Sequence, residues 1–205
     1  MAKITFADVD LPEAEPLADL SGAARDLESA RGLAKYLAER LASGTFHLEV
    51  VDAFSTAILV RYARPFMTGV RARLDEDTLT NLTLEERHLH EKFVAWRSKH
   101  IAHSVNPFEE NRVVAYYNEQ TVGETGIQSI SLRQDRLVGL SMQDLTDIQK
   151  LADTVLALVN ARIAAEKARV LEIVRSRPLA EILAAGIKPR RSAGIESVNK
   201  ARKKG

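Results

Sequence analysis

The amino-acid sequence predicts a mainly α protein: a four-helix bundle with a β-hairpin inserted between the third and fourth long helices. Apolar residues recur every three or four positions in four stretches, which is the period of an amphipathic helix. Between the third and fourth stretches the period changes to alternation, and proline or glycine marks several of the boundaries. At 205 residues and 45% hydrophobic composition, the chain is long enough to bury one core.

The first two helices are predicted from apolar stripes that end at glycine or proline. The stretch from Ser21 to Ser43 ends before Gly44, a residue that commonly follows a helix. The stretch from Phe46 to Arg64 ends at Pro65, which cannot continue a helical hydrogen-bond pattern. Its stripe consists of Val50, Val51, Phe54, Ile58 and Leu59.

The third and fourth helices have start signals as well as stripes. Thr83 is followed three residues later by Glu86, a capping box, and the helix is expected to continue until Asn106-Pro107. Ser141 begins the fourth helix, which is expected to extend as far as Arg177. At about 1.5 Å per residue this helix would be roughly 50 Å long, so we expect its far end to project or to pack on a partner.

The hairpin is predicted at about 112–134. Two segments rich in β-branched and aromatic residues, RVVAYYNEQ and IQSISLRQ, flank the turn-like sequence TVGETG. The expected organisation is an N-terminal extension (1–20), the helical bundle (21–187) and a basic, disordered tail (188–205).

The tail carries a charge that the chain as a whole hides. It contains seven Lys or Arg and one Glu, a net charge of +6, which leaves −5 for residues 1–187 of a chain with net charge +1. Such a tail is compatible with an arm that contacts nucleic acid or an acidic partner. It is equally the composition of a solubilising, disordered terminus.

Composition and missing motifs exclude several classes of protein. The absence of cysteine rules out disulfides and thiolate metal sites, which favours a reducing, cytoplasmic location. No apolar run approaches the roughly 20 residues that span a bilayer, so we expect no membrane association. A Gly-rich phosphate loop, paired zinc-ligand motifs and a nucleophile elbow are also missing, so the sequence indicates no cofactor.

Chemistry-bearing residues gather at the end of the third helix, in WRSKHIAHSVNPFEENR (96–112). Cations at a helix C-terminus gain about 0.3–1 kcal/mol from the helix dipole, so an ordinary solvated helix end is one interpretation. The other is a site that handles phosphate, with Arg61 and Arg64 at the end of the second helix as supporting cations. The candidate residues in the cluster are Arg97, Ser98, His100, His103 and Asn106.

In the phosphate interpretation, the chemistry is cleavage of RNA by attack of the ribose 2′-hydroxyl on the adjacent phosphate. Histidine accepts and donates protons near neutral pH, and the arginine guanidinium binds phosphate oxygens. In an ideal helix Arg97 and His103 lie about 120° apart, so a second copy across a two-fold axis would be needed to join them. One His103 would then act as base and its symmetry mate as acid, while Ser98, His100 or Asn106 orients the phosphate.

A zinc site finds less support. His100 and His103 are three residues apart, and His88 and His90 lie nearby, but a firm third ligand is missing. No metal is therefore assigned.

The residues RSKHIAH resemble the hallmark of the HEPN superfamily, R-x-K-x-x-A-H near the end of a bundle helix, and Arg97 and His103 match its arginine and histidine. The resemblance implies a homodimer with facing motifs and, in active members, a metal-independent endoribonuclease. It further implies a toxin, antiviral or RNA-processing system, with RNA and a cognate antitoxin or other protein as partners. Ser98 departs from the Asn, Asp or His that often follows the arginine. A non-catalytic helical module for dimerisation and partner binding is the alternative.

Overall fold

The computed structural model of the chain describes residues 7–45, 47–67, 73–74, 76–101, 109–122, 125–136 and 139–184. These residues form six α-helices, two short 3-10 helices, one π-helical turn and a two-stranded antiparallel sheet. The elements in chain order are η1 (Pro12–Ala14), α1 (Glu15–Ala42), α2 (Leu48–Ala63), η2 (Arg64–Phe66), α3 (Glu76–Thr80), α4 (Leu84–Trp96), the π-helix (Arg97–Ile101), β1 (Glu109–Val122), β2 (Thr125–Arg136), α5 (Met142–Arg175) and α6 (Leu179–Ala184). The predicted helical bundle with a hairpin is confirmed.

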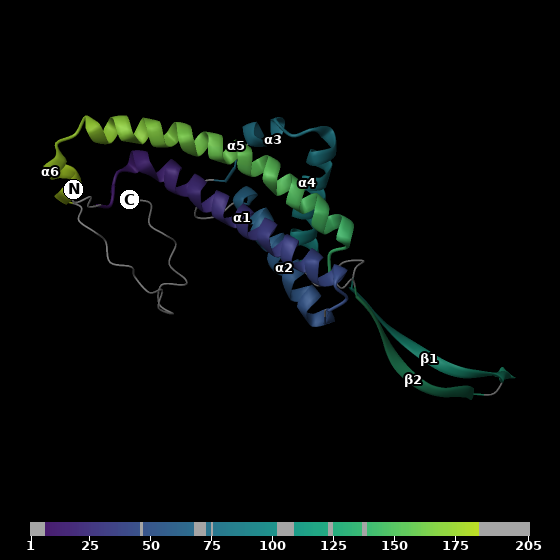
Figure 1. The fold of residues 1–205 in the computed structure, drawn as a ribbon. Helices are drawn as coiled ribbons and strands as arrows, with labels where there is room; N and C mark the ends of the chain where they lie inside the picture. The colour runs from purple at the N-terminus through teal and green to yellow at the C-terminus, as the bar shows by residue number, and fades with distance from the viewer. Residues whose placement is uncertain are drawn as a thin grey trace.

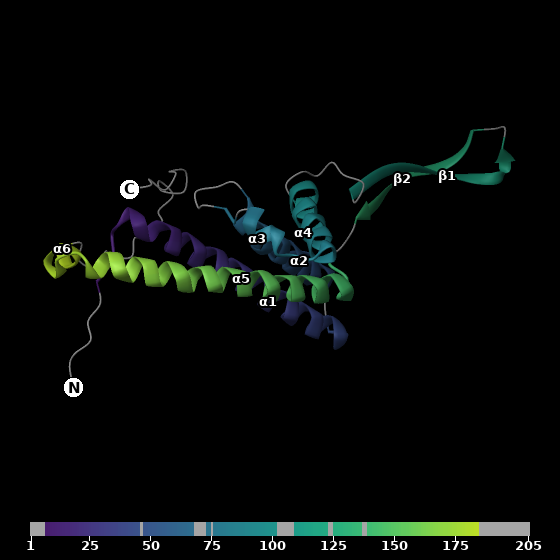
Figure 2. The ribbon, with the colours of Figure 1, turned by 90° about the horizontal axis from the view of Figure 1, so that it is seen from above.

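The two longest helices, α1 and α5, lie side by side and run in opposite directions (Figures 1 and 2). On α1, Leu27, Ala30, Ala34 and Leu37 are fully buried. Their spacing of three and four residues forms one stripe that faces the apolar stripe of α5. The two alanines between the leucines leave room for the larger apolar side chains of α5.

Helices α2 and α4 complete the bundle. Tyr62 of α2 and Phe93 of α4 are fully buried, with their rings 6.0 Å apart in an edge-on arrangement. The Tyr62 hydroxyl lies 2.9 Å from Nδ1 of His90, so this buried polar group has a partner. Burial, with a smaller contribution from the charge of Glu86, raises the pKa of Tyr62, which therefore keeps its O–H proton.

The predicted capping box at the start of α4 is present, and a second one lies at the predicted start of the fourth helix. The Thr83 hydroxyl accepts a hydrogen bond from the Glu86 N–H, and the Glu86 carboxylate accepts one from the Thr83 N–H. Ser141 and Asp144 make the same pair of bonds at the start of α5. These bonds satisfy N–H groups that the first turn of a helix leaves without a partner.

The helix boundaries depart from prediction in three places. Helix α1 begins at Glu15, inside the predicted N-terminal extension, because Pro16 lies in the first turn, where its missing N–H costs nothing. The α-helical part of the third helix ends at Trp96, where π-helical hydrogen bonding takes over. The short helices α3 and α6 were not predicted, since each is too brief to show a period.

The far end of α5 contacts the N-terminal turn of the same chain, while the expected packing on a partner stays a prediction. Arg169 donates to the Glu13 carbonyl at 2.6 Å, and Arg177 forms an ion pair with the Glu13 carboxylate at 3.2 Å. Val170 of α5 and Ile182 of α6 are buried. The N-terminal turn of the same chain therefore contacts this end of α5, while most residues from 164 to 175 remain exposed.

The hairpin extends away from the helices (Figures 1 and 2). Its strands, at Glu109–Val122 and Thr125–Arg136, are slightly longer than predicted. None of the helices that the structure describes is long and apolar enough to cross a membrane. The tail at 188–205 lies outside the described residues.

Candidate functional site

The candidate site lies where α4 passes into the π-helix. Arg97 is the residue at this junction, and its N–H donates to the carbonyls of Phe93 and Val94. The Arg97 side chain is half-buried and makes no hydrogen bond or ion pair with any side chain that the structure describes. A guanidinium in this setting keeps its donors free for an anion.

The π-helix changes the geometry expected from an ideal helix. In a π-helix the N–H bonds to a carbonyl five residues earlier, so each turn contains more residues than an α-helical turn. The angular spacing of an ideal α-helix therefore does not apply across Arg97–Ile101, and the position of His103 lies outside the described residues. π-Helical turns are rare and often mark functional sites.

The remaining predicted residues of the cluster are only partly described. Ser98 lies in the π-helix and is half-buried. The backbone of His100 belongs to the same turn, whereas its side chain, together with all of His103 and Asn106, lies outside the described residues. The structure thus places Arg97 and Ser98 next to each other and leaves the positions of the other three as predictions.

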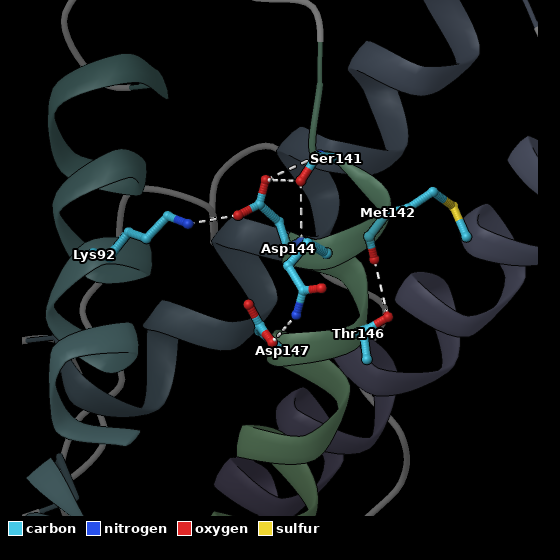
Figure 3. A network of polar contacts seen from close by, with 7 residues as sticks. Lys92, Ser141, Met142, Asp144, Thr146 and Asp147 are labelled. Atoms are coloured by element: carbon cyan, nitrogen blue, oxygen red, sulfur yellow. Dashed lines mark hydrogen bonds and ion pairs between the residues drawn. The ribbon is translucent and has the colours of Figure 1, made fainter. Parts of the chain in front are cut away.

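Lys92 ties this end of α4 to the start of α5 (Figure 3). Its ammonium lies 2.6 Å from the Asp144 carboxylate and 4.9 Å from the centre of the Trp96 ring. Trp96 immediately precedes Arg97, so the ion pair and the cation–π contact both restrain the backbone that carries the arginine.

Asp144 is ionised in this network for an identifiable reason. Its burial raises the carboxyl pKa, but hydrogen bonds from Lys92 and Ser141 and the charge of Lys92 outweigh that effect, and the pKa is lowered overall. The sequence predicted a helix start at Ser141, next to which Asp144 lies in the first turn. Lys92 was missed because it lies 52 residues away in sequence.

Arg61 and Arg64 share one carboxylate. Both bind Oδ1 of Asp26, at 2.9 and 3.2 Å, and the Asp26 side chain is only 4% exposed. Both arginine side chains remain nearly half exposed. The pair therefore carries roughly one net positive charge beyond what Asp26 neutralises, and part of its donor capacity is used inside the protein.

Of the four histidines weighed as zinc ligands, only His88 and His90 have described side chains, and neither belongs to a metal-binding group among the described residues. His90 is buried, and its Nδ1 is occupied by Tyr62, while its ring lies 4.4 Å from that of Phe66. No group of three His, Asp or Glu side chains suitable for a metal occurs among the described residues. His90 therefore acts as a core residue that fixes α4 against α2.

A small pocket lies elsewhere, between the beginning of α1 and the middle of α5. The residues that line it include both acidic and basic side chains. One of them, Arg162, donates a hydrogen bond to the Thr78 hydroxyl at 2.9 Å. Arg162 is 18 positions beyond Asp144 on α5, or roughly 27 Å along the helix. The pocket is therefore separate from the Arg97 end.

No protein-family model, curated protein or solved structure matches this chain.

Proposed function

We propose that the protein is a HEPN-like RNA-binding or RNA-cleaving protein that uses Arg97 and His103 without a metal ion. The observation that carries the proposal is the contrast among its arginines. Arg61 and Arg64 are paired with Asp26, whereas Arg97 is half-buried at a restrained helix end without a carboxylate partner among the described side chains. An RNA phosphate is an anion that suits such a group, because its oxygens accept two guanidinium hydrogen bonds at once.

The proposed reaction is attack of the ribose 2′-hydroxyl on the adjacent phosphorus. One His103 removes the hydroxyl proton, and the second copy's His103 protonates the departing 5′-oxygen. Arg97 binds the phosphate oxygens as negative charge develops on them. Ser98, His100 and Asn106 orient the phosphate in this proposal, and the product is a 2′,3′-cyclic phosphate.

The restraint of α4 supports the same proposal. An arginine on a mobile side chain and a mobile backbone loses conformational entropy when it binds, which reduces affinity. The Lys92–Asp144 ion pair and the Lys92–Trp96 contact remove part of that cost before the ligand arrives. Arg97 is in this sense preorganised for an anion.

The decisive experiment incubates the purified protein with mixed RNA in the presence and absence of chelator. We expect chelator-resistant cleavage with cyclic phosphate ends, reduced about 100-fold or more in Arg97→Ala because a charge-stabilising donor is lost. Arg31→Ala is the matched control, since it removes an equal charge from an exposed pair with Asp153. An equal loss of cleavage activity in both variants would mean that Arg97 acts only through the overall charge of the protein.

The two-copy arrangement has its own test. His103→Ala and Arg97→Ala should each be inactive with unchanged helical content. Mixing them under conditions of subunit exchange gives heterodimers that hold one intact Arg97 and one intact His103 from different chains, and partial recovery of activity would show that this single pair is sufficient. Verified exchange without recovery would mean that each site needs both arginines or both histidines.

The alternative is a non-catalytic module for dimerisation and partner binding, with a cognate antitoxin or another protein as partner. The exposed apolar face of the hairpin is the observation that favours it. RNA that is bound but never cut, with Arg97→Ala still reducing the affinity, would support RNA binding alone. A protein that neither binds nor cleaves RNA would favour the protein-binding alternative.

A further inference from the structure

The hairpin is an element without the support that a two-stranded sheet ordinarily requires. It extends from the helical body, and the remaining described elements do not cover it (Figures 1 and 2). An isolated two-stranded hairpin is marginally stable in water, and stability usually needs a third strand or a surface to pack on. The length of the strands, 14 and 12 residues, increases this need.

The strand register separates the hairpin into one apolar face and one largely polar face. Directly paired residues lie on the same face, so Val113 pairs with Leu132 and Ala115 with Ile130. A register shift after Tyr116 then pairs Tyr117 with Ile127 on that face. The opposite face holds Arg112, Val114, Tyr116, Ser129, Ser131 and Arg133.

The apolar face is open to solvent. The exposed fractions are 70% for Val113 and Ile130, 68% for Leu132, 63% for Ile127 and 61% for Tyr117. Single exposed apolar residues are common on protein surfaces, but a continuous strip on one face of a projecting element marks an interaction surface.

A second exposed apolar group lies at the base of the hairpin. The segment after β2 is fastened to α2, because the Leu140 N–H donates to the Ser55 hydroxyl at 2.9 Å. Gly139 approaches Val51 of α2 closely, Leu48 and Val50 lie within one turn of Val51, and Met142 follows the N-cap of α5; these three flanking side chains are exposed. We call the hairpin strip and these three residues together the arm surface.

We propose that the arm surface binds a second copy of this chain. Its eight large apolar side chains are roughly 60% exposed on average. At about 100 Å² of apolar surface per side chain they offer about 500 Å² per copy. Two copies bury about 1,000 Å² of apolar area, and since homodimer interfaces are about 65% apolar, roughly 1,500 Å² in total.

The estimated interface area favours a second copy of the chain as the partner that covers the arm surface. A stable interface buries about 1,200–2,000 Å², which two complete arm surfaces reach around a two-fold axis because every side chain counts twice. The hairpin strips alone reach only about 1,000 Å² by the same estimate. The second copy carries the matching apolar surface in its own sequence.

Charge also favours the second copy over RNA. The segment 109–136 contains five acidic and three basic residues, a net charge of −2, which is unfavourable for binding a phosphate backbone. The whole chain has a net charge of only +1, so two copies repel each other weakly. The inference does not depend on the proposed RNA chemistry.

The test compares two substitutions on adjacent residues of β2. Ile130→Asp introduces a charge on the apolar face, and Ser131→Asp introduces the same charge on the opposite face. Sedimentation should give a dimer for the wild-type protein and for Ser131→Asp, and a dissociation constant at least 10-fold higher for Ile130→Asp. A wild-type monomer at about 100 μM, or an Ile130→Asp protein that dimerises as strongly as wild type, overturns the proposal.

The absence of cysteine allows a second measurement that does not depend on hairpin stability. Val113→Cys on the apolar face should form an interchain disulfide under mild oxidation, and Ser129→Cys on the opposite face should not. Equal crosslinking of both variants overturns the proposal. The RNA proposal is tested separately, by cleavage with the wild-type protein and with Arg97→Ala, because Arg97 lies outside the arm surface.

Discussion

Asp26 determines how much of the charge of Arg61 and Arg64 is available to a ligand. Its carboxylate is buried on α1, in the stripe that also contains Leu27. A buried carboxylate without partners would lose its hydration at high cost, so the two guanidinium groups stabilise the bundle by binding it. The sequence suggested a phosphate role because the arginines are near one helix end, while Asp26 lies 35 and 38 residues away.

We expect Asp26→Asn to lower the free energy of unfolding by about 1–2 kcal/mol, since the buried side chain loses its charge-assisted bonds. Arg61→Ala should cost less, because Arg64 still binds Asp26 and the pair is partly screened by solvent. Urea denaturation checks both. Asp153→Asn, which breaks an exposed ion pair with Arg31, is the control and should change stability by about 0.5 kcal/mol or less.

At the scale of single elements, the ion pair between α4 and α5 should make stability depend on pH. The pKa of Asp144 is lowered in the folded state, so its contribution is complete above the ordinary carboxyl pKa of about 3.9 and is lost as pH falls through the lower, folded-state value. Asp144→Asn should therefore be less stable than wild type by about 1 kcal/mol at pH 7. The difference should shrink below about pH 4.

Thermal or urea denaturation at pH 7 and pH 3 measures this difference. The control Asp147→Asn lies on the same helix and changes the same charge, but its carboxylate accepts from Gln143 rather than from Lys92. A difference between wild type and Asp144→Asn that stays constant over this pH range would contradict the assigned ion pair.

The connection between β2 and α5 depends on a glycine. Gly139 has a φ of +93°, and a Cβ there would lie 2.4 Å from Cγ1 of Val51, a buried and conformationally stiff side chain. Gly139→Ala should destabilise the protein by about 2–3 kcal/mol through backbone strain and overpacking.

Gly32→Ala provides the opposite case on α1. A Cβ at Gly32 meets nothing within 4 Å, and alanine is the better helix former. We expect a gain of about 0.5–1 kcal/mol in urea denaturation. Destabilisation by both changes, to a similar extent, would mean that the close approach at Gly139 is not the cause.

For the whole molecule, the described core extends from Leu20 to Ile182. Truncation before Lys188 should therefore leave the free energy of unfolding within about 1 kcal/mol of the full chain, a shift of roughly 2–4 °C or less in Tm. Truncation after Arg175 should cost about 1–3 kcal/mol, because it removes the buried Ile182 and the Arg177–Glu13 ion pair. Calorimetry of the two shortened proteins checks both predictions. A large loss of stability in the protein truncated before Lys188 would show that the tail has a structural role.

The sequence by itself determined the mainly helical class, the four long helices, the hairpin and the capping box at Thr83. These features come from residues within a few positions of one another: apolar periodicity, a Ser or Thr three residues before an acid, and alternation in a strand. It also singled out Arg97 as a candidate, because the cluster of polar and cationic residues is local.

The tertiary structure alone decided which of those residues have partners. Arg61 and Arg64 bind Asp26, and Lys92 binds Asp144. The Tyr62 hydroxyl forms a hydrogen bond with His90. The partners in each of these pairs are at least 28 residues apart in sequence. Packing of one helix on another sets such contacts, and a local pattern does not contain that information. The same reason explains why the apolar face of the hairpin was predicted as a strand pattern but not as an exposed surface: exposure depends on whether another element covers the strand.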